Sequence, residues 1–149
     1  MTVEVDQSGR IEDLSTGTAI AIANGKSSAV FVSAGTKRKI IVRLRRNSFI
    51  PAKDLPAIIF SVVLFMLIEE HKIDVLKIDE EYTGKNEIIE ETLKKLYLRS
   101  RKKRIPDVRF VRIGKQSPAH KVAWEVHRSK GRSPDTKKVS EKNILQYVL

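Results

Sequence analysis

The sequence contains no cysteine. Disulfide bonds, zinc ribbons and thiol catalysis are therefore excluded together, and any bound metal must be held by oxygen or imidazole ligands. The chain also lacks the basic and apolar segments of a signal peptide, and its longest apolar run, Pro56 to Ile68, falls well short of the roughly 20 residues that span a bilayer. We expect a soluble, cytoplasmic protein that has no membrane partner.

Several common catalytic motifs are missing as well. There is no Walker A loop, no dinucleotide-binding glycine pattern, no serine-nucleophile elbow and no pair of histidines at zinc-protease spacing. Enzyme classes outside phosphoryl chemistry therefore have no support in the sequence.

Charge of one sign dominates the composition. The chain has 29 lysines and arginines against 18 acids, which gives a formal net charge of +11 over 149 residues. An excess of this sign attracts polyanions, so nucleic acid is the leading partner class, although a basic surface can also serve solubility or heat resistance. With 41% hydrophobic and 32% charged residues, the length predicts one globular domain over residues 1–149.

The N-terminal third is typical of β-structure. Thr2 to Asp6 alternates apolar and polar side chains before Gln7-Ser8-Gly9 breaks the pattern, so Asp6 lies at a strand end. Thr16 to Ala23 and Ser27 to Ser33 flank Asn24-Gly25, a pair suited to a type I′ turn, which predicts a hairpin. Lys37 to Arg46 fits both helical and strand spacing, and we favour a third meander strand.

The apolar segment that follows predicts a helix. Asp54 reads as its N-cap, with Pro56 in the first turn, and the helix extends to about His71. Because it is apolar all round and a sheet can cover only one side, we expect a homo-oligomer, a dimer or trimer, through Pro56–Ile68.

The rest of the chain alternates strands and helices. Ile73 to Asp79 predicts a short buried strand, Asn86 to Arg99 an amphipathic helix and Val108 to Ile113 the last strand. Ser117 and Pro118 open another helix, and a short helix from about Ser140 to Leu149 closes the chain. This order predicts an α/β fold.

Acidic residues end two of these strands. Asp6 follows the first strand, and Asp79-Glu80-Glu81 follows the strand after the apolar helix. If the two strands are parallel neighbours, their carboxylates meet at the carboxyl ends, where they would form a natural Mg²⁺ or Mn²⁺ site. The alternative is that Asp6 caps a turn and the other acids open the next helix.

The element order and two motifs, Val3 to Gly9 and Glu70 to Tyr82, resemble the ribonuclease H-like superfamily. The resemblance implies a mixed five-stranded sheet with a three-strand antiparallel meander and flanking helices, with Asp79 as a metal-binding aspartate. Within this superfamily the chain looks most like small archaeal exonucleases that act on single-stranded DNA. The segments Asp6 to Gly9 and Asp79 to Lys85 carry this closer resemblance. Ribonucleases H, resolvases and transposases share the superfamily.

Two positions depart from that resemblance. The family's glutamate in the first helix has no counterpart in Leu55 to Ile59, and Glu12 and Glu80 are candidates to supply it. The fourth acidic position is also altered, and its candidates are His120, Glu125 and Asp135. Helical geometry points Glu125 away from the core, whereas His120 could bind metal or transfer a proton, or be an ordinary interfacial residue.

The main hypothesis is a Mg²⁺- or Mn²⁺-dependent nuclease, most similar to an exonuclease on single-stranded DNA. Its candidate catalytic residues are Asp6, Asp79, His120 and Glu80, and its candidate metal ligands are Asp6, Asp79, Glu12 and His120. The alternatives are a non-catalytic nucleic-acid-binding module on the same fold, a ribonuclease H or resolvase-type endonuclease, and a structural subunit that binds acidic protein.

Basic clusters and a few other residues are candidates for contacts with nucleic acid. The clusters are Lys37, Arg38, Lys39, Arg43, Arg45 and Arg46; Arg101 to Arg104; and Lys115, Lys121, Arg128, Lys130, Arg132, Lys137 and Lys138. The leading contacts are Ser8, Tyr82, Lys85, Lys115, Lys121, Arg128 and Lys130. Tyr82 and Trp124 could stack on bases, although helix packing is our preferred interpretation of Trp124. His127 is read as structural or as a phosphate contact.

Overall fold

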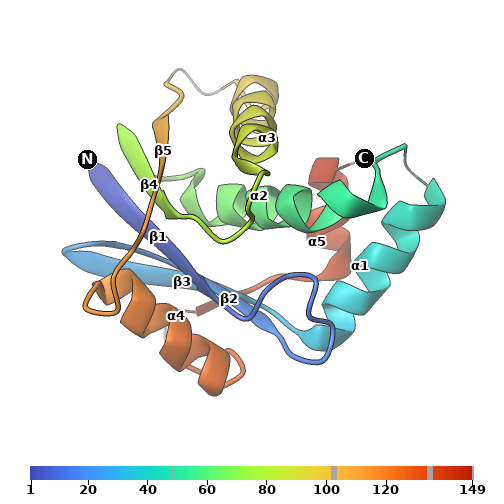
Figure 1. Cartoon of the computed structure of the whole chain (residues 1–149), viewed down its shortest axis with the longest axis horizontal. Helices are drawn as coiled ribbons and strands as arrows, with labels where there is room; N and C mark the ends of the chain where they lie inside the picture. Colours follow the sequence, from blue (N-terminus) through green and yellow to red (C-terminus); the bar gives the residue numbers. More distant parts are fainter. Residues whose placement is uncertain (48, 102–103, 134–135, 149) are drawn as a thin grey trace.

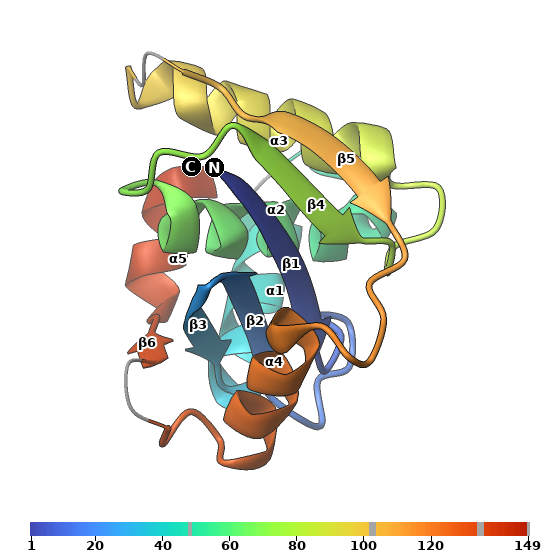
Figure 2. The ribbon, with the colours of Figure 1, turned by 90° about the vertical axis from the view of Figure 1, so that its left-hand side faces the viewer.

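Six strands form one mixed sheet in the order β5-β4-β1-β2-β3-β6 (Figure 1 and Figure 2). The computed structural model describes residues 1–47, 49–101, 104–133 and 136–148. In chain order its elements are β1 (Thr2–Ser8), β2 (Thr18–Asn24), β3 (Lys26–Val32), α1 (Ala34–Asn47), the 3₁₀ helix η1 (Ala52–Asp54), α2 (Leu55–Ile68), β4 (Val75–Asp79), α3 (Asn86–Arg99), β5 (Asp107–Val111), α4 (Pro118–Arg128), β6 (Thr136–Lys138) and α5 (Glu141–Val148).

The sheet combines two kinds of pairing. β1, β2 and β3 form an antiparallel meander, whereas β4 pairs in parallel with both β1 and β5. The α/β class is therefore confirmed, but the sheet has six strands and not five. The additional strand is β6, which pairs in parallel with β3 at the far edge of the sheet and is too short to show a pattern in the sequence.

The β2–β3 hairpin is present, but its turn differs from the prediction. Asn24 pairs with Lys26, so that Gly25 alone forms the tip, with a φ of 72°. A type I′ turn needs positive φ at both central residues. Asn24 is not in that region, so the predicted type I′ turn is wrong. A Cβ atom at Gly25 would meet no atom within 4 Å apart from its chain neighbours.

The segment Lys37–Arg46 is helical, which corrects our preference for a strand. The Ser33 hydroxyl accepts a hydrogen bond from the Thr36 amide at 3.1 Å and caps the start of α1. Ile40, Ile41 and Leu44 are buried on one side of the helix, as helical spacing requires. The strand-like alternation of Val42 to Arg45 was misleading because Val42, although apolar, is exposed together with the two arginines.

Helix α2 finds its cover within the chain. Every residue from Ile59 to Ile68 is buried, and α2 contacts α3, α5 and β3. The helix begins at Leu55 and ends at Ile68, short of the predicted His71. The sequence argument for a dimer or trimer through this helix therefore fails, because neighbouring helices cover the sides that the sheet leaves open. Among the described residues, no helix has the length and apolar character needed to cross a membrane.

The two faces of the sheet are packed differently. Val3, Val5 and the other large aliphatic side chains of the sheet face α2 in the main core. On the opposite face, α4 packs over β1, β2 and β3 (Figure 2). The packing there is made mostly of small residues, namely Ala19, Ala21, Ala29, Phe31, Ala123 and Val126. The alternation of β1 places Glu4, Asp6 and Ser8 on this second face.

Candidate metal centre

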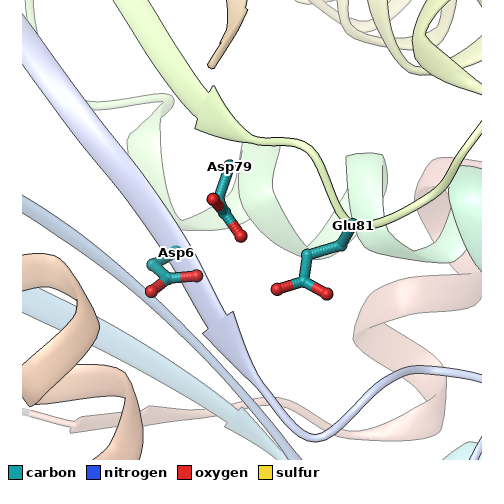
Figure 3. Close-up of side chains that lie close together, drawn as sticks. All are labelled: Asp6, Asp79 and Glu81. Atoms are coloured by element: carbon teal, nitrogen blue, oxygen red, sulfur yellow. The ribbon is translucent and has the colours of Figure 1, made fainter. Parts of the chain in front are cut away.

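Two parallel strands bring the acidic residues together. The β1–β4 register pairs Val5 with Ile78, so Asp6 and Asp79 follow directly on neighbouring strands. Glu81 lies two residues beyond Asp79. Each of the three offers a carboxylate oxygen, and these oxygens all lie within 4.8 Å of one another. Figure 3 shows the three carboxyl groups directed toward a common space. The predicted meeting of Asp6 and Asp79 at the carboxyl ends of parallel strands is confirmed.

Asp6 is the most buried of the three, with 3% of its surface exposed. Its Oδ1 accepts a hydrogen bond from the Gln7 amide at 2.8 Å, and its Oδ2 lies 2.8 Å from Nδ1 of His120. Burial raises the pKa of Asp6 above its ordinary value, and the hydrogen bond with His120 opposes that rise. Both oxygens are thus fixed in position by the fold.

Asp79 is held from the other side of β4. The Ile113 amide, just beyond β5, donates to its Oδ1 at 2.7 Å. Charge-assisted hydrogen bonds of this kind fix a carboxylate more firmly than neutral ones do. The backbone amides of Gln7 and Ile113 and the His120 side chain therefore orient both carboxylates before any ligand arrives.

Glu81 has a strongly raised pKa. Burial, a hydrogen bond with Asp79 and the negative charges of Asp79 and Asp6 raise the pKa of Glu81 to about 7. Three carboxylates at this spacing repel one another when all are ionised. A divalent cation among them would remove that repulsion, and an all-oxygen donor set is the kind that Mg²⁺ and Mn²⁺ prefer. The residues present therefore fit such a metal.

Glu80 and Glu12, the predicted helpers, lie outside the cluster. Both are exposed. Glu80 accepts a hydrogen bond from the Asn86 amide group, and Glu12 forms an ion pair with Arg10. The sequence did carry a signal for Glu81, because side chains two apart in an extended chain point the same way. Alternation from Asp79 selects Glu81 and rejects Glu80.

Helix α4 is fastened to β1 at three points. The Ser117 hydroxyl donates to Glu4 at 3.2 Å, His120 bonds Asp6, and Nδ1 of His127 lies 2.9 Å from the Ser8 hydroxyl. Ser117 also caps the helix as predicted, by accepting from the Ala119 amide. His120 therefore lies beside the acidic site, in contact with Asp6, but the group of residues that could hold a metal does not include it.

The remaining candidates on and after α4 take different places in the structure. His127 is structural, because its Nε2 also lies 2.8 Å from the Thr16 hydroxyl, and burial lowers its pKa. Glu125 is exposed, as the helical geometry predicted. Asp135 lies outside the described residues.

Several predicted nucleic-acid contacts are occupied within the protein. Tyr82 is only 5% exposed, and its hydroxyl donates to Gln7 and accepts from the Ile11 amide, so base stacking on Tyr82 is contradicted. Lys85 forms an ion pair with Asp54 at 2.8 Å, and Asp54 holds the predicted N-cap position of α2 without a capping hydrogen bond from its side chain. Ser8 is bound to His127.

The basic clusters are also only partly available. Lys37 is fully buried and donates to the backbone carbonyls of Arg10 and Asp13, so it cannot contact a phosphate. The other leading candidates are exposed. They are Lys115, Lys121, Arg128 and Lys130.

Trp124 contradicts our preferred interpretation. It is 50% exposed on α4, with the Arg128 guanidinium 4.6 Å from the centre of its ring. It does not pack the helix against the sheet.

Comparison with known proteins identifies no relative, so the site is interpreted from its geometry alone. No protein-family model matches the chain, and the curated proteins give no match to it.

Proposed function

We propose that the protein is a nuclease that uses Mg²⁺ or Mn²⁺ to hydrolyse phosphodiester bonds. The observation that carries the proposal is the cluster of Asp6, Asp79 and Glu81 at the carboxyl ends of two adjacent parallel strands. Ligand sites in open α/β sheets form at such ends. The net charge of +11 supports a polyanionic substrate, which the acidic cluster alone would repel.

The narrower proposal is a ribonuclease H-like fold and exonuclease action on single-stranded DNA. The antiparallel meander, the later helix α2, strand β4, helix α3, strand β5 and helix α4 follow the element order on which that resemblance rests, with α1 as an additional helix between β3 and α2. Asp6 lies in the first-strand motif that carries the resemblance, and Asp79, on the parallel strand β4, is the residue that the resemblance implies as a metal-binding aspartate. Endonuclease action of the ribonuclease H or resolvase type is the alternative on the same site.

Each residue has a distinct role in the proposed chemistry. Asp6, Asp79 and Glu81 would hold the cation, which supplies stabilisation of the charge that develops on the phosphodiester group. An ionised Asp6 only accepts hydrogen bonds, so it favours a proton on Nδ1 of His120 and leaves Nε2 as the acceptor. His120 is half-buried, and its Nε2 could take a proton from an attacking water.

A cleavage assay tests the proposal. Wild-type protein should degrade end-labelled single-stranded DNA in Mg²⁺ or Mn²⁺ and not in EDTA, with duplex and hybrid substrates run in parallel. Asp6→Asn and Asp79→Asn should each lower the rate by at least about 100-fold, because even the partners of metal ligands cost 10- to 100-fold when removed. Undiminished cleavage by the double variant would overturn the assignment.

Glu81 and Glu80 provide a matched pair for the metal itself. Glu81→Gln should weaken Mn²⁺ binding, followed by the electron paramagnetic resonance signal of free Mn²⁺, and should abolish the rise in melting temperature that saturating metal produces. Glu80→Gln removes the same charge one residue away and should leave both readouts as in the wild type. Equal effects of the two variants would mean that the local charge matters and the cluster does not.

A protein that binds nucleic acid without cleaving it in either metal would be a non-catalytic module. Binding that falls with salt but ignores EDTA would characterise that outcome.

A further inference from the structure

The exposed face of α4 carries an unusual side chain. Trp124 is the single tryptophan of the chain, and half of its surface is accessible, although large aromatic residues are normally well buried. It is absent from the cluster of residues that packs α4 against the sheet. The role of Trp124 therefore lies on the outside of the molecule.

Trp124 belongs to a stripe that starts at the acidic site. His120, Trp124 and Arg128 are spaced four residues apart, so they lie one above the other along one side of α4. His120 bonds Asp6 at the start of this stripe, and Arg128 stacks on the Trp124 ring. From His120 to Arg128 the helix rises about 12 Å. The stripe thus runs from the carboxylates outward over the surface.

The surroundings of the stripe are strongly basic. Between residues 112 and 132 the sequence has one acid, Glu125, against six lysines and arginines. The six are Arg112, Lys115, Lys121, Arg128, Lys130 and Arg132, and all are exposed. A polyanion laid along α4 would therefore meet cations along its length.

The combination of an accessible indole and flanking cations identifies the class of ligand. Phosphates need only the charges, whereas an aromatic face adds affinity when unpaired bases can stack on it. Bases in a duplex are already stacked on each other and cannot reach a ring on a helix surface. An acidic protein segment would use the lysines and arginines but would leave the indole without a planar partner.

We propose that α4 is a platform for single-stranded nucleic acid, on which a base stacks against Trp124 while Arg128 and Lys121 contact neighbouring phosphates. The strand then leads along the stripe to Asp6. The direction of the strand rests on the proposed function, but the binding itself does not.

The chain supplies its own probe, because Trp124 is the only source of tryptophan fluorescence. An oligothymidylate should be titrated into the full-length protein in EDTA, so that no cleavage occurs, and the fluorescence followed. The matched ligand is an abasic oligomer of equal length and charge. We expect quenching by the oligothymidylate, little by the abasic oligomer, and weaker binding of duplex DNA. Equal quenching by the abasic oligomer would overturn the stacking contact.

Variants test each contact with a labelled oligothymidylate and its fluorescence anisotropy. Trp124→Ala should weaken binding by about 5- to 150-fold, and Trp124→Phe should recover most of that loss. Arg128→Ala should reduce the slope of log affinity against log salt by about 0.7, the value for one phosphate contact on a single strand. Lys142→Ala, an exposed charge on α5, should leave affinity nearly unchanged. Circular dichroism checks that each variant is folded.

The outcomes separate this inference from the nuclease proposal. Quenching without any cleavage in Mg²⁺ or Mn²⁺ would keep the platform and reject the nuclease. Metal-dependent cleavage with wild-type affinity in Trp124→Ala would keep the nuclease and reject the platform.

Discussion

The two faces of the sheet are packed by different kinds of side chain, although strand β1 contributes residues to both. Toward α2, the side chains are large and aliphatic, and α3 and α5 add further layers. Toward α4, the sheet offers mainly alanine methyl groups, and hydrogen bonds from Ser117, His120 and His127 fasten the single covering helix. We call the face toward α2 the thick face and the face toward α4 the thin face.

The difference teaches where stability and chemistry reside. Burying large aliphatic groups supplies most of the free energy of folding, so the α2 face can hold the sheet rigid. The α4 face contributes less apolar area but holds Asp6 and His120 at hydrogen-bonding distance. Three experiments test whether stability depends mainly on the α2 face and the site on the α4 face, in decreasing order of expected effect.

The largest change in the free energy of unfolding should come from creating a cavity on the thick face. Phe65 is fully buried on α2, and its ring meets that of Tyr97 edge-on at a centroid distance of 5.0 Å. Phe65→Ala should lower the free energy of unfolding by about 3–5 kcal/mol, measured by urea denaturation. Val42→Ala, a truncation at an exposed position of α1, should change it by less than about 0.5 kcal/mol. Similar values for the two would show that α2 is not the main source of stability.

Overpacking the thin face should lower the free energy of unfolding by less, but it should also weaken metal binding. Ala123 is fully buried where α4 meets the sheet. Ala123→Leu should cost about 1–3 kcal/mol by overpacking, and it should also weaken Mn²⁺ binding by lifting His120 away from Asp6. Glu125→Leu places the same side chain on the exposed side of α4 and is the control. Unchanged Mn²⁺ affinity in a destabilised Ala123→Leu would separate the packing of α4 from the site.

The smallest effect concerns the buried cation on the thick face. Burial lowers the pKa of Lys37 from 10.5 to about 8. Between these values the unfolded chain keeps the proton that the folded protein has lost, so this group makes stability rise as pH rises through that window. The slope is at most about 1.4 kcal/mol per pH unit.

Lys37→Met isolates that slope from other titrations. The free energy of unfolding should be measured for both proteins between pH 8 and pH 10. The raised pKa values of Tyr82 and Tyr97 act in the opposite direction but are common to both proteins, so they cancel in the difference. A difference that stays flat with pH would contradict a buried, charged Lys37.

Local patterns predicted the part of the structure that local forces decide. Alternation predicted β1, a short apolar run predicted β4, and two β-rich segments around Asn24-Gly25 predicted the β2–β3 hairpin. The ends of β1 and β4 then brought Asp6 and Asp79 together. The cap at Ser117 located α4 and, with it, His120. These features depend on the period of the side chains and on which groups satisfy a helix end.

The errors arose where distant segments decide the outcome. The cover of α2 comes from α3 and α5, which no pattern inside α2 reveals. Lys37 looked like a surface cation because its acceptors, the carbonyls of Arg10 and Asp13, lie more than 20 residues away. Trp124 looked like a core residue because its apolar character says nothing about the small alanines that already fill the space beneath α4.

The open tip of the β2–β3 hairpin gives the molecule a natural handle. The tip lies at the end of β2 that pairs near the start of β1, away from Asp6, and Asn24 and Lys26 on either side of Gly25 are exposed. Because the chain has no cysteine, a Lys26→Cys substitution would introduce its only thiol. A dye coupled there would accept energy from Trp124, and this donor–acceptor pair would report the distance between hairpin tip and α4 in solution without further labelling.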